Sequence, residues 1–381
     1  MNLLYIASPK SIHDAKWINH FAKMHRVIVI CMKGEEIGSR LDQKIPIHAI
    51  LPTRYPLLNL IKRIQIVDQI KIILRENKID LVHSIFCYPN SLWAYHTGIS
   101  NHIITTRGSD ILIEYNQKYS KPKNIHELIS FALLKFITRK AFRKAKFVTS
   151  TSQGQQKVIQ QFISDPDKLW LIRTGVDIHE FPYGPGKGKS SGLPIRIFSP
   201  RAMRPIYNIE IIIKGVALLQ SHYSGKQLVE LVLLNYQTNS EYFNTIKNLL
   251  KELNLENSVT IMDSLTTNEL IDQFHQSDLV VMIPRSDGTP ISGIEAMLCK
   301  KPLILGNLPY DNDLFNLESV WKIPEFTAEA LFLKMLEILT LSEGEKNLKL
   351  EKASLLAHSH GDLKAQLKKF EALYEKVLAP S

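Results

Sequence analysis

Residues 279–305, LVVMIPRSDGTPISGIEAMLCKKPLIL, contain an apolar run, a polar loop and the start of a helix, in that order. The run 279–283 predicts a buried parallel strand, so the loop lies at a strand's carboxyl end, where open α/β sheets bind ligands. A helix beginning near Ile291 points free N–H groups and a positive dipole at that place. Asp287 in the loop and Glu295 about one helical turn in supply two carboxylates that accept hydrogen bonds from hydroxyls. The stretch therefore predicts an anion site suited to a sugar nucleotide.

Asp287 and Glu295, with seven residues between them, resemble the nucleotide-sugar signature of the retaining glycosyltransferases of family 4, which have the GT-B fold. In that family the second carboxylate holds the nucleotide ribose and the first lies near the donor sugar. The resemblance gives these roles to Glu295 and Asp287. The predicted donor site is completed by the loop and helix start, Gly288, Thr289, Ile291 and Ser292.

The signature departs from the family at two positions. The first acid is usually Glu, and Phe-Gly usually stands where this chain has Thr289-Pro290. Pro290 has no N–H to offer a phosphate. A Ser-Asp-Gly-Thr-Pro sequence nonetheless resembles one branch of the family. The alternative without the resemblance is a solvated loop before a core helix.

Length and composition indicate a protein of two domains. The chain has 381 residues and a mass of 43.6 kDa, more than one ordinary core accommodates. Hydrophobic residues make up 45% and charged residues 22%, which excludes extensive disorder. The three cysteines are widely spaced among apolar neighbours, which favours a reducing compartment. Without a basic leader or an apolar run of ~18 residues, we expect a cytoplasmic protein, with any membrane contact peripheral and at the inner face.

Short apolar runs alternate with helix-length amphipathic stretches along the chain, which predicts parallel, doubly wound sheets. Residues 1–182 form the expected acceptor-side Rossmann-like domain, and the Gly-, Ser- and Lys-rich residues 183–194 form a hinge or linker. A second Rossmann-like domain, which binds the nucleotide sugar, follows at 195–360. By resemblance to GT-B enzymes, a helix in residues 361–381 crosses back to the first domain, and the two domains face each other across a cleft.

The second informative segment follows the first strand of the second domain, at the expected run 195–199. Arg201 and Arg204 leave this strand together, and guanidinium groups match phosphate geometry with fixed donors. Both are candidates for binding the donor diphosphate. The family usually has Gly-Arg-Leu here with a Lys a few residues on; Arg201 matches the Arg, whereas Tyr207-Asn208 stand near the Lys. Asn208 joins the predicted donor-binding set. Two surface arginines after a strand are the alternative.

A strand over 103–106 leads into Arg107, Gly108 and Asp110 in the first domain. The family commonly has His where this chain has Arg107, and that His lies near the donor sugar. Arg107 stays protonated near neutral pH, so it can orient substrate or neutralise charge but cannot transfer protons. Asp110 matches an acid of the family two positions past the Gly, and a helix N-cap explains it equally well. Arg107 and Asp110 join Asp287 in the predicted catalytic group.

The first loop of the chain, residues 8–17, is the expected acceptor side. Ser11 and His13 are its candidates for lining the acceptor site. A solvated His in a loop is the alternative for His13.

Positive charge concentrates in Lys118–Lys146, where nine Lys and Arg accompany the single acid Glu127 and several large apolar residues. The pattern predicts a basic amphipathic helix that can lie on an anionic membrane. A core-packed helix with a solvated basic face is the alternative. A nucleic-acid-binding protein ranks last and no nucleic-acid partner is expected, because no recognition motif or aromatic platform accompanies the charge.

The sequence therefore predicts a retaining glycosyltransferase that moves a sugar from a UDP- or GDP-sugar to a saccharide or lipid-linked acceptor, in cell-surface polysaccharide or glycolipid synthesis. No essential cofactor or metal is expected, because Cys-x-x-Cys and His-Glu-x-x-His motifs are missing from the sequence. The competing hypothesis is a non-catalytic GT-B homologue that binds carbohydrate or acts as a scaffold.

Overall fold

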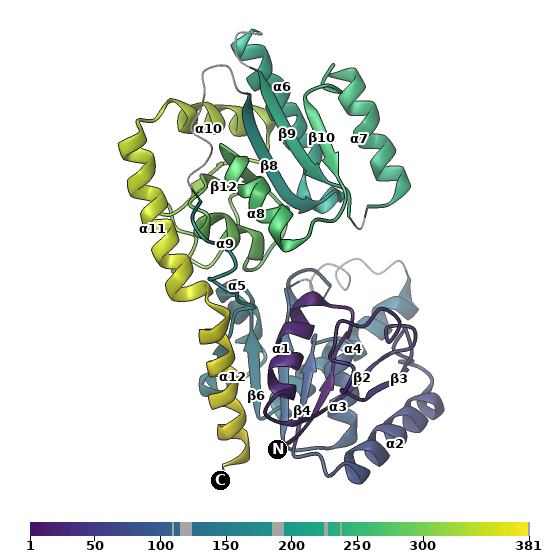
Figure 1. The fold of residues 1–381 in the computed structure, drawn as a ribbon. Coiled ribbons are helices and arrows are strands. Elements are labelled where there is room, and N and C mark those ends of the chain that lie inside the picture. Colours follow the sequence, from purple (N-terminus) through teal and green to yellow (C-terminus); the bar gives the residue numbers. More distant parts are fainter. Residues whose placement is uncertain (109, 115–123, 185–193, 225–227, 237, 380–381) are drawn as a thin grey trace. The chain divides into compact units, whose positions relative to one another are not determined.

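The structure is a computed structural model that describes residues 1–108, 110–114, 124–184, 194–224, 228–236 and 238–379 (Figure 1). The residues form two compact units, each with one parallel sheet. The first unit comprises Met1–Thr174 and Ala365–Ser381, and the second comprises Gly175–Lys364.

The sheet of the first unit has seven parallel strands in the order β3-β2-β1-β4-β5-β6-β7. Its inner strands are largely buried on both faces, as expected of a sheet covered by helices on each side, whereas the edge strands β3 and β7 are partly buried. The strands are β1 Asn2–Ile6, β2 Arg26–Met32, β3 Ile47–Leu51, β4 Leu81–Ile85, β5 His102–Thr106, β6 Phe147–Ser150 and β7 Leu169–Leu171.

Capping side chains set where the helices of this unit begin. Apolar periodicity before β4 starts at Leu57, but the helix begins at Leu60, because the Asn59 side chain accepts from the N–H of Lys62. The first helix likewise begins at Ile12, since Ser11 caps it. The helices are α1 Ile12–Ala22, α2 Leu60–Glu76, α3 Asn90–Thr97, α4 Ile125–Lys144 and α5 Gln153–Ile159, with a π-helical turn at Asp110–Glu114.

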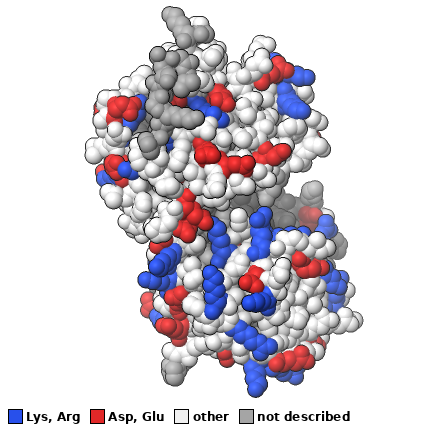
Figure 2. Space-filling model, viewed as in Figure 1, with Lys and Arg blue, Asp and Glu red and all other residues white. Residues whose placement is uncertain are grey.

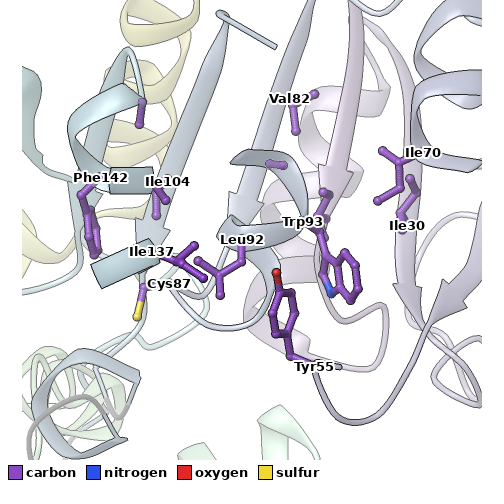
Figure 3. Close-up of a cluster of buried hydrophobic side chains, with 14 of the residues drawn as sticks. Ile30, Tyr55, Ile70, Val82, Cys87, Leu92, Trp93, Ile104, Ile137 and Phe142 are labelled. Atoms are coloured by element: carbon purple, nitrogen blue, oxygen red, sulfur yellow. The ribbon is translucent and has the colours of Figure 1, made fainter. Parts of the chain in front are cut away.

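One face of this sheet packs against α2, α3 and α4. The apolar side chains of these helices meet those of the strands in a single core (Figure 3). Trp93 on α3 is fully buried there, and its ring lies 4.8 Å from the ring of Tyr55, centroid to centroid. The three helices thus take their positions from burial of apolar surface on one side of the sheet.

The last helix, α12 Leu363–Leu378, lies within the residues 361–381 where a helix is expected, and from Ala365 onward it packs with the first unit. Hydrogen bonds join it to the sheet: the Tyr374 hydroxyl lies 2.7 Å from Tyr5 Oη and 2.7 Å from His83 Nδ1. His83 Nε2 in turn lies 2.6 Å from Thr105 Oγ1. A buried polar network therefore fixes the end of the chain on the first sheet.

The second unit has six parallel strands in the order β10-β9-β8-β11-β12-β13. They are β8 Ile195–Ala202, β9 Val229–Leu234, β10 Val259–Met262, β11 Leu279–Met282, β12 Leu303–Leu305 and β13 Trp321–Lys322. The helices are α6 Ile209–Tyr223, α7 Ser240–Glu252, α8 Thr267–Gln276, α9 Ile291–Leu298, α10 Ala328–Thr340 and α11 Glu343–Gly361, with a 3-10 turn at Pro205–Tyr207.

The first unit ends at Thr174, eight residues before the expected domain end at 182. Val176 forms a parallel bridge with Asp362, and both Val176 and Phe181 belong to the apolar core of the second unit. Gly175 has a φ of +78°, and a Cβ there would lie 2.6 Å from Leu363 Cα. The chain after Thr174 is therefore held by the second unit. Residues 185–193 of the expected linker lie outside the described residues.

Within the described residues, no helix has both the length and the apolar character that a membrane span requires.

Candidate functional site

Arg201 and Asp287 form an ion pair at the carboxyl edge of the second sheet. Arg201 leaves the end of β8 and Asp287 stands in the loop after the adjacent strand β11. Arg201 Nη2 lies 3.1 Å from Asp287 Oδ2, and both side chains are largely buried. Parallel strands bring their carboxyl ends to one edge, which explains why residues 86 positions apart meet here.

Three tyrosines interact with the Arg201 guanidinium. Its Cζ lies 4.3 Å from the centre of the Tyr207 ring, close enough for a cation–π interaction. Burial is the largest single influence and lowers the pKa of Arg201. The Asp287 carboxylate, Tyr207 and Tyr236 act together in the opposite direction, so that the pKa is raised above its usual value. Tyr310, in the loop after β12, also interacts electrostatically with Asp287 and Arg201.

Two polar atoms of this cluster lack a hydrogen bond among the described residues. Asp287 Oδ1 accepts from the N–H of Gly288 at 2.9 Å. Asp287 Oδ2 is buried and accepts no hydrogen bond, because its 3.1 Å contact with Arg201 lacks hydrogen-bond geometry. The Tyr310 hydroxyl is buried without a partner as well. Since buried polar atoms are normally satisfied, these two mark a place where a ligand can bind.

The loop that carries Asp287 is tied to the loop after β12, since Thr289 Oγ1 donates to Asp311 Oδ2 at 2.9 Å. Pro290 then precedes α9, which has no side-chain cap. Ile291 and Ser292 form the first turn of α9, and their N–H groups point along the helix axis toward the loop. The arrangement keeps a helix N-terminus available to an anion.

Glu295 lies about one turn into α9, partly buried and near Tyr236, whose pKa it raises as a lesser cause beside burial. Close packing sets the position of α9. A Cβ on Gly293 would lie 3.2 Å from Phe315 and 3.3 Å from the Pro290 ring. The two acids of the signature thus sit on a loop and a helix whose positions the core determines.

Asn208 holds two loops of this site together. It has a left-handed backbone with φ of +53°, its Nδ2 donates to the Ile283 carbonyl at 2.8 Å, and its Oδ1 accepts from Arg285 Nε at 2.8 Å. The nitrogen and the oxygen of the Asn208 amide thus both form hydrogen bonds within the protein. Arg204, by contrast, is exposed at the start of the 3-10 turn.

In the first unit, Arg107 is held by its own unit rather than exposed for substrate. Its Nη2 lies 3.4 Å from Asp14 Oδ1, its Nη1 donates to Thr174 Oγ1 at 3.0 Å, and its Cζ lies 4.8 Å from the centre of the Trp17 ring. Asp14 is fully buried, and burial raises its pKa; the charge of Arg107 and hydrogen bonds with Ser11 and Ser8 oppose the rise.

Asp110 organises the turn after β5. Its Oδ1 accepts from the N–H groups of Arg107, Gly108 and Ile111 at 3.0, 2.9 and 3.0 Å. Its Oδ2 accepts from the N–H of Cys87 at 2.8 Å. Burial raises the pKa of Asp110, and these hydrogen bonds work against the rise. The geometry gives this carboxylate a positioning role for two loops.

Ser11 and His13, the two residues expected on the acceptor side, lie at the start of α1. Ser11 Oγ accepts from the N–H of Asp14 at 3.2 Å and so caps the helix. Both residues are partly buried. They stand after β1, at the same sheet edge as the turn after β5 that holds Arg107.

Sequence reasoning missed Asp14, Arg285, Tyr310 and Asp311. Tyr310 and Asp311 follow β12, whose carboxyl end lies beside that of β11. The edge rule that singled out Asp287 applies equally to residues after the neighbouring strand. Asp14, buried in α1, carried no comparable signal, because its partner Arg107 comes from a distant strand.

Two family models match the chain. The model described as Glycosyl transferase 4-like matches residues 2–152, and the model described as Glycosyl transferases group 1 matches residues 187–354. Between them they account for most of both units. The chain belongs to the GT4-type glycosyltransferases.

Curated relatives of this glycosyltransferase match over part of their length. A D-inositol 3-phosphate glycosyltransferase of Kineococcus radiotolerans is 22% identical over 169 residues, and one of Pseudarthrobacter chlorophenolicus is 25% identical over 166 residues. Each match covers 42% of this chain and 39% of the relative. The aligned part is thus about two fifths of these relatives.

Solved structures confirm the predicted GT-B fold class. A glycosyltransferase of Rickettsia africae superimposes with a TM-score of 0.73 at 18% identity, covering 100% of this chain and 99% of that one. Anabaena HepE, solved in complex with UDP and glucose, gives a TM-score of 0.71 at 15% identity over 99% of this chain and 100% of that chain. At these identities the likeness establishes the fold of this glycosyltransferase and not its substrates.

Proposed function

We propose that the protein transfers a sugar from a nucleotide-sugar donor to a saccharide or lipid-linked acceptor, with retention of configuration and without an essential metal. The observation that carries the proposal is the buried Arg201–Asp287 pair beside the uncapped start of α9, with Glu295 one turn further. In this arrangement the cation and the helix N-terminus can bind the diphosphate of a donor. The two carboxylates can bind its sugar and its ribose.

Arg201 supplies the main positive charge for the leaving diphosphate. Its guanidinium is fixed between Asp287 and the Tyr207 ring before any donor binds, so little side-chain freedom is lost on binding. Negative charge grows on the diphosphate as the glycosidic bond breaks, and a positioned cation together with helix N–H groups stabilises that charge. Asp287 orients the donor sugar and does not attack it, and Glu295 binds the ribose.

The relatives narrow the panel of substrates for a first assay. HepE was solved with UDP and glucose and with UDP-glucose, and the curated relatives are named for D-inositol 3-phosphate. UDP-sugars should therefore be screened first for hydrolysis, followed by GDP-, ADP- and CMP-sugars, with inositol phosphate and a membrane extract among the acceptors. A role in cell-surface polysaccharide or glycolipid synthesis follows if a lipid-linked acceptor is used.

Donor binding tests the proposal directly. We expect Arg201→Ala and Glu295→Ala each to weaken binding of UDP or GDP by about tenfold or more, because each removes a charge-assisted hydrogen bond. Titration calorimetry measures the effect. Arg204→Ala is the matched control: its side chain is exposed, so a smaller loss is expected. Unchanged binding in both the Arg201 and the Glu295 variants would contradict the proposed site.

A non-catalytic GT-B homologue is the second candidate, and the Arg107–Asp14 contact favours it. Arg107 stands at the position where the family commonly has His, and this contact gives it a structural role instead of a catalytic one. Turnover separates the two candidates: a protein that binds nucleotide sugar but neither hydrolyses nor transfers it with any acceptor of the panel is the binding homologue.

A further inference from the structure

The excess of positive charge belongs entirely to the first unit. That unit contains 29 Lys and Arg against 14 Asp and Glu, whereas the second contains 18 against 23. Figure 2 shows Lys and Arg spread over the visible face of the first unit. An anionic partner of this protein would therefore be drawn to the first unit and not to the second.

Helix α4 of this unit exposes a continuous apolar stripe along its first twelve residues. Its members recur at intervals of three or four, so they share one face. They are Ile125, Leu128, Ile129, Leu133 and Phe136, exposed by 61, 47, 56, 38 and 54%. The opposite face, with Leu134, Ile137, Ala141 and Phe142, is buried in the core. The exposed stripe is thus surplus to folding of the unit.

The same exposed face becomes basic in the second half of α4. Arg139, Lys140, Arg143 and Lys144 continue the spacing of the stripe and are exposed. Lys140 Nζ lies 4.5 Å from the centre of the Phe136 ring, so charge and apolar surface adjoin. Residues 125–144 contain one acid, Glu127. Lys118, Lys121 and Lys123 of the predicted basic segment lie outside the described residues.

The start of α2 adds apolar surface at the same edge. Leu60, Ile61 and Ile64 are exposed by 56, 72 and 50%, and Leu58 before the helix by 76%. α3 contacts both α2 and α4, and all three cover one face of a parallel sheet. Crossover helices run opposite to their strands, so α2 and α4 both begin at the carboxyl edge. The loops holding Ser11 and Arg107 lie at that edge too.

We propose that the exposed faces of α4 and of the start of α2 dock the protein on an anionic bilayer. The apolar side chains enter the boundary between headgroups and acyl chains, and the cations of α4 contact anionic headgroups. Charge complementarity selects this partner, since a stripe that passes from apolar to basic along one helix matches a bilayer with negative headgroups. This inference rests on the proposed function: in this orientation the carboxyl edge of the first sheet faces a lipid-linked acceptor.

Co-sedimentation of the full chain with vesicles tests the docking. Vesicles of phosphatidylcholine containing about one third phosphatidylglycerol should bind the protein, and pure phosphatidylcholine vesicles should bind it much less. Joint replacement Ile129→Ser and Phe136→Ser should lower partitioning at least about tenfold. Arg139→Gln with Lys140→Gln should lower it about fivefold per charge, and high salt should act likewise. Circular dichroism confirms that each variant is folded.

The matched control is Leu348→Ser with Leu355→Ser on α11, two side chains exposed by 78 and 66% in the second unit. Loss of vesicle binding in this pair equal to that of the α4 pair would overturn the proposal. So would equal binding to both vesicle types, or a concentration-dependent dimer that the α4 variants abolish while vesicles do not bind.

Donor hydrolysis separates failure of the docking from failure of the proposed function. None of the α4 residues lies in the candidate donor site, so hydrolysis should persist in every variant. Hydrolysis without vesicle binding overturns the docking alone. Vesicle binding by a protein that neither binds nor hydrolyses any nucleotide sugar supports the docking and counts against the proposed function.

Discussion

The Tyr310 hydroxyl in the candidate site is placed to bind a donor sugar. This hydroxyl is buried and has no hydrogen-bond partner in the described part of the chain, and Asp287 Oδ2 accepts no hydrogen bond there beyond its ion pair with Arg201. Thr289 ties the loop of Tyr310 to the loop of Asp287 through Asp311. A donor sugar at Asp287 offers hydroxyls to both. We expect Tyr310→Phe to weaken binding of the nucleotide sugar about tenfold, the loss of roughly one buried hydrogen bond, with little effect on the free nucleotide.

Paired calorimetric titrations with a nucleotide sugar and with its nucleotide measure this difference. Tyr183→Phe, at a side chain 57% exposed, is the control and should bind both ligands normally. Equal weakening of both ligands by Tyr310→Phe would assign the hydroxyl to the nucleotide, and no weakening would remove it from the site.

Arg107, at the position where the family commonly has His, stabilises the fold of the first unit. Its contact with the fully buried Asp14 predicts that Arg107→Leu lowers the free energy of unfolding by about 3 kcal/mol or more, because an uncompensated carboxylate remains buried. The double change Arg107→Leu with Asp14→Asn should recover part of that loss. Denaturant unfolding of the wild type and the two variants measures both effects; a fully stable Arg107→Leu protein would contradict the structural role.

At the scale of elements, α12 depends on polar as well as apolar contacts. Its Phe370 and Tyr374 are fully buried, and the Tyr374 hydroxyl lies between Tyr5 and His83. We expect Tyr374→Phe to cost about 1–3 kcal/mol of stability, since it leaves groups on β1 and β4 without their partner. Hydrogen exchange should quicken in α12 first. Wild-type exchange along α12 in this variant would show that apolar packing alone holds the helix.

At the same scale, caps explain where predicted and observed helices differ. The apolar periodicity of α2 extends back to Leu57, yet the helix begins at Leu60, because Asn59 accepts from the N–H of Lys62. Periodicity identifies the buried face of a helix, whereas the terminus follows from one local hydrogen bond. For α12, whose apolar pattern stops with the helix, the helix expected in residues 361–381 forms at Leu363–Leu378.

At the scale of the whole molecule, the two parallel sheets could be predicted because apolar strands alternate with amphipathic helices. Arg201 and Asp287 could also be predicted, since each follows a strand whose carboxyl end lies at the edge where such sheets bind ligands. The partners Asp14 and Tyr310 could not. Their roles arise from contacts between distant segments, and no local pattern in the sequence encodes which buried charge faces which. The boundary at Thr174 depended likewise on the long-range bridge between Val176 and Asp362.

Buried histidines predict how stability depends on pH. In the first unit, burial lowers the pKa of His83 and of His102 to about 3 and that of His96 to about 4. The folded state keeps these rings neutral, whereas the unfolded chain protonates them near pH 6.5. Stability from this source is therefore complete above about pH 6.5 and is lost as pH falls, by about 1.4 kcal/mol per pH unit for each ring.

Two buried acids act in the opposite sense. Burial raises the pKa of Asp14 and of Asp110, so their contribution to stability increases as pH falls toward the usual carboxylate range. Below about pH 6.5 the three histidines should lower the stability of the first unit, and proton uptake by the two acids offsets part of that loss. Denaturant unfolding followed by tryptophan fluorescence reports mainly this unit, because Trp17, Trp93 and Trp170 lie in it and Trp321 alone lies in the other.

His83→Gln isolates one ring of the three. Gln can keep hydrogen bonds to Tyr374 and Thr105 without taking up a proton. Below about pH 6.5 the slope of stability against pH should therefore be smaller in this variant by about 1.4 kcal/mol per pH unit. Replacing the exposed His179 with Gln should leave the slope unchanged. A wild-type slope in the His83 variant would mean that the ring protonates in the folded protein near its ordinary pKa, and that its hydrogen bonds to α12 and β5 do not depend on its neutral form.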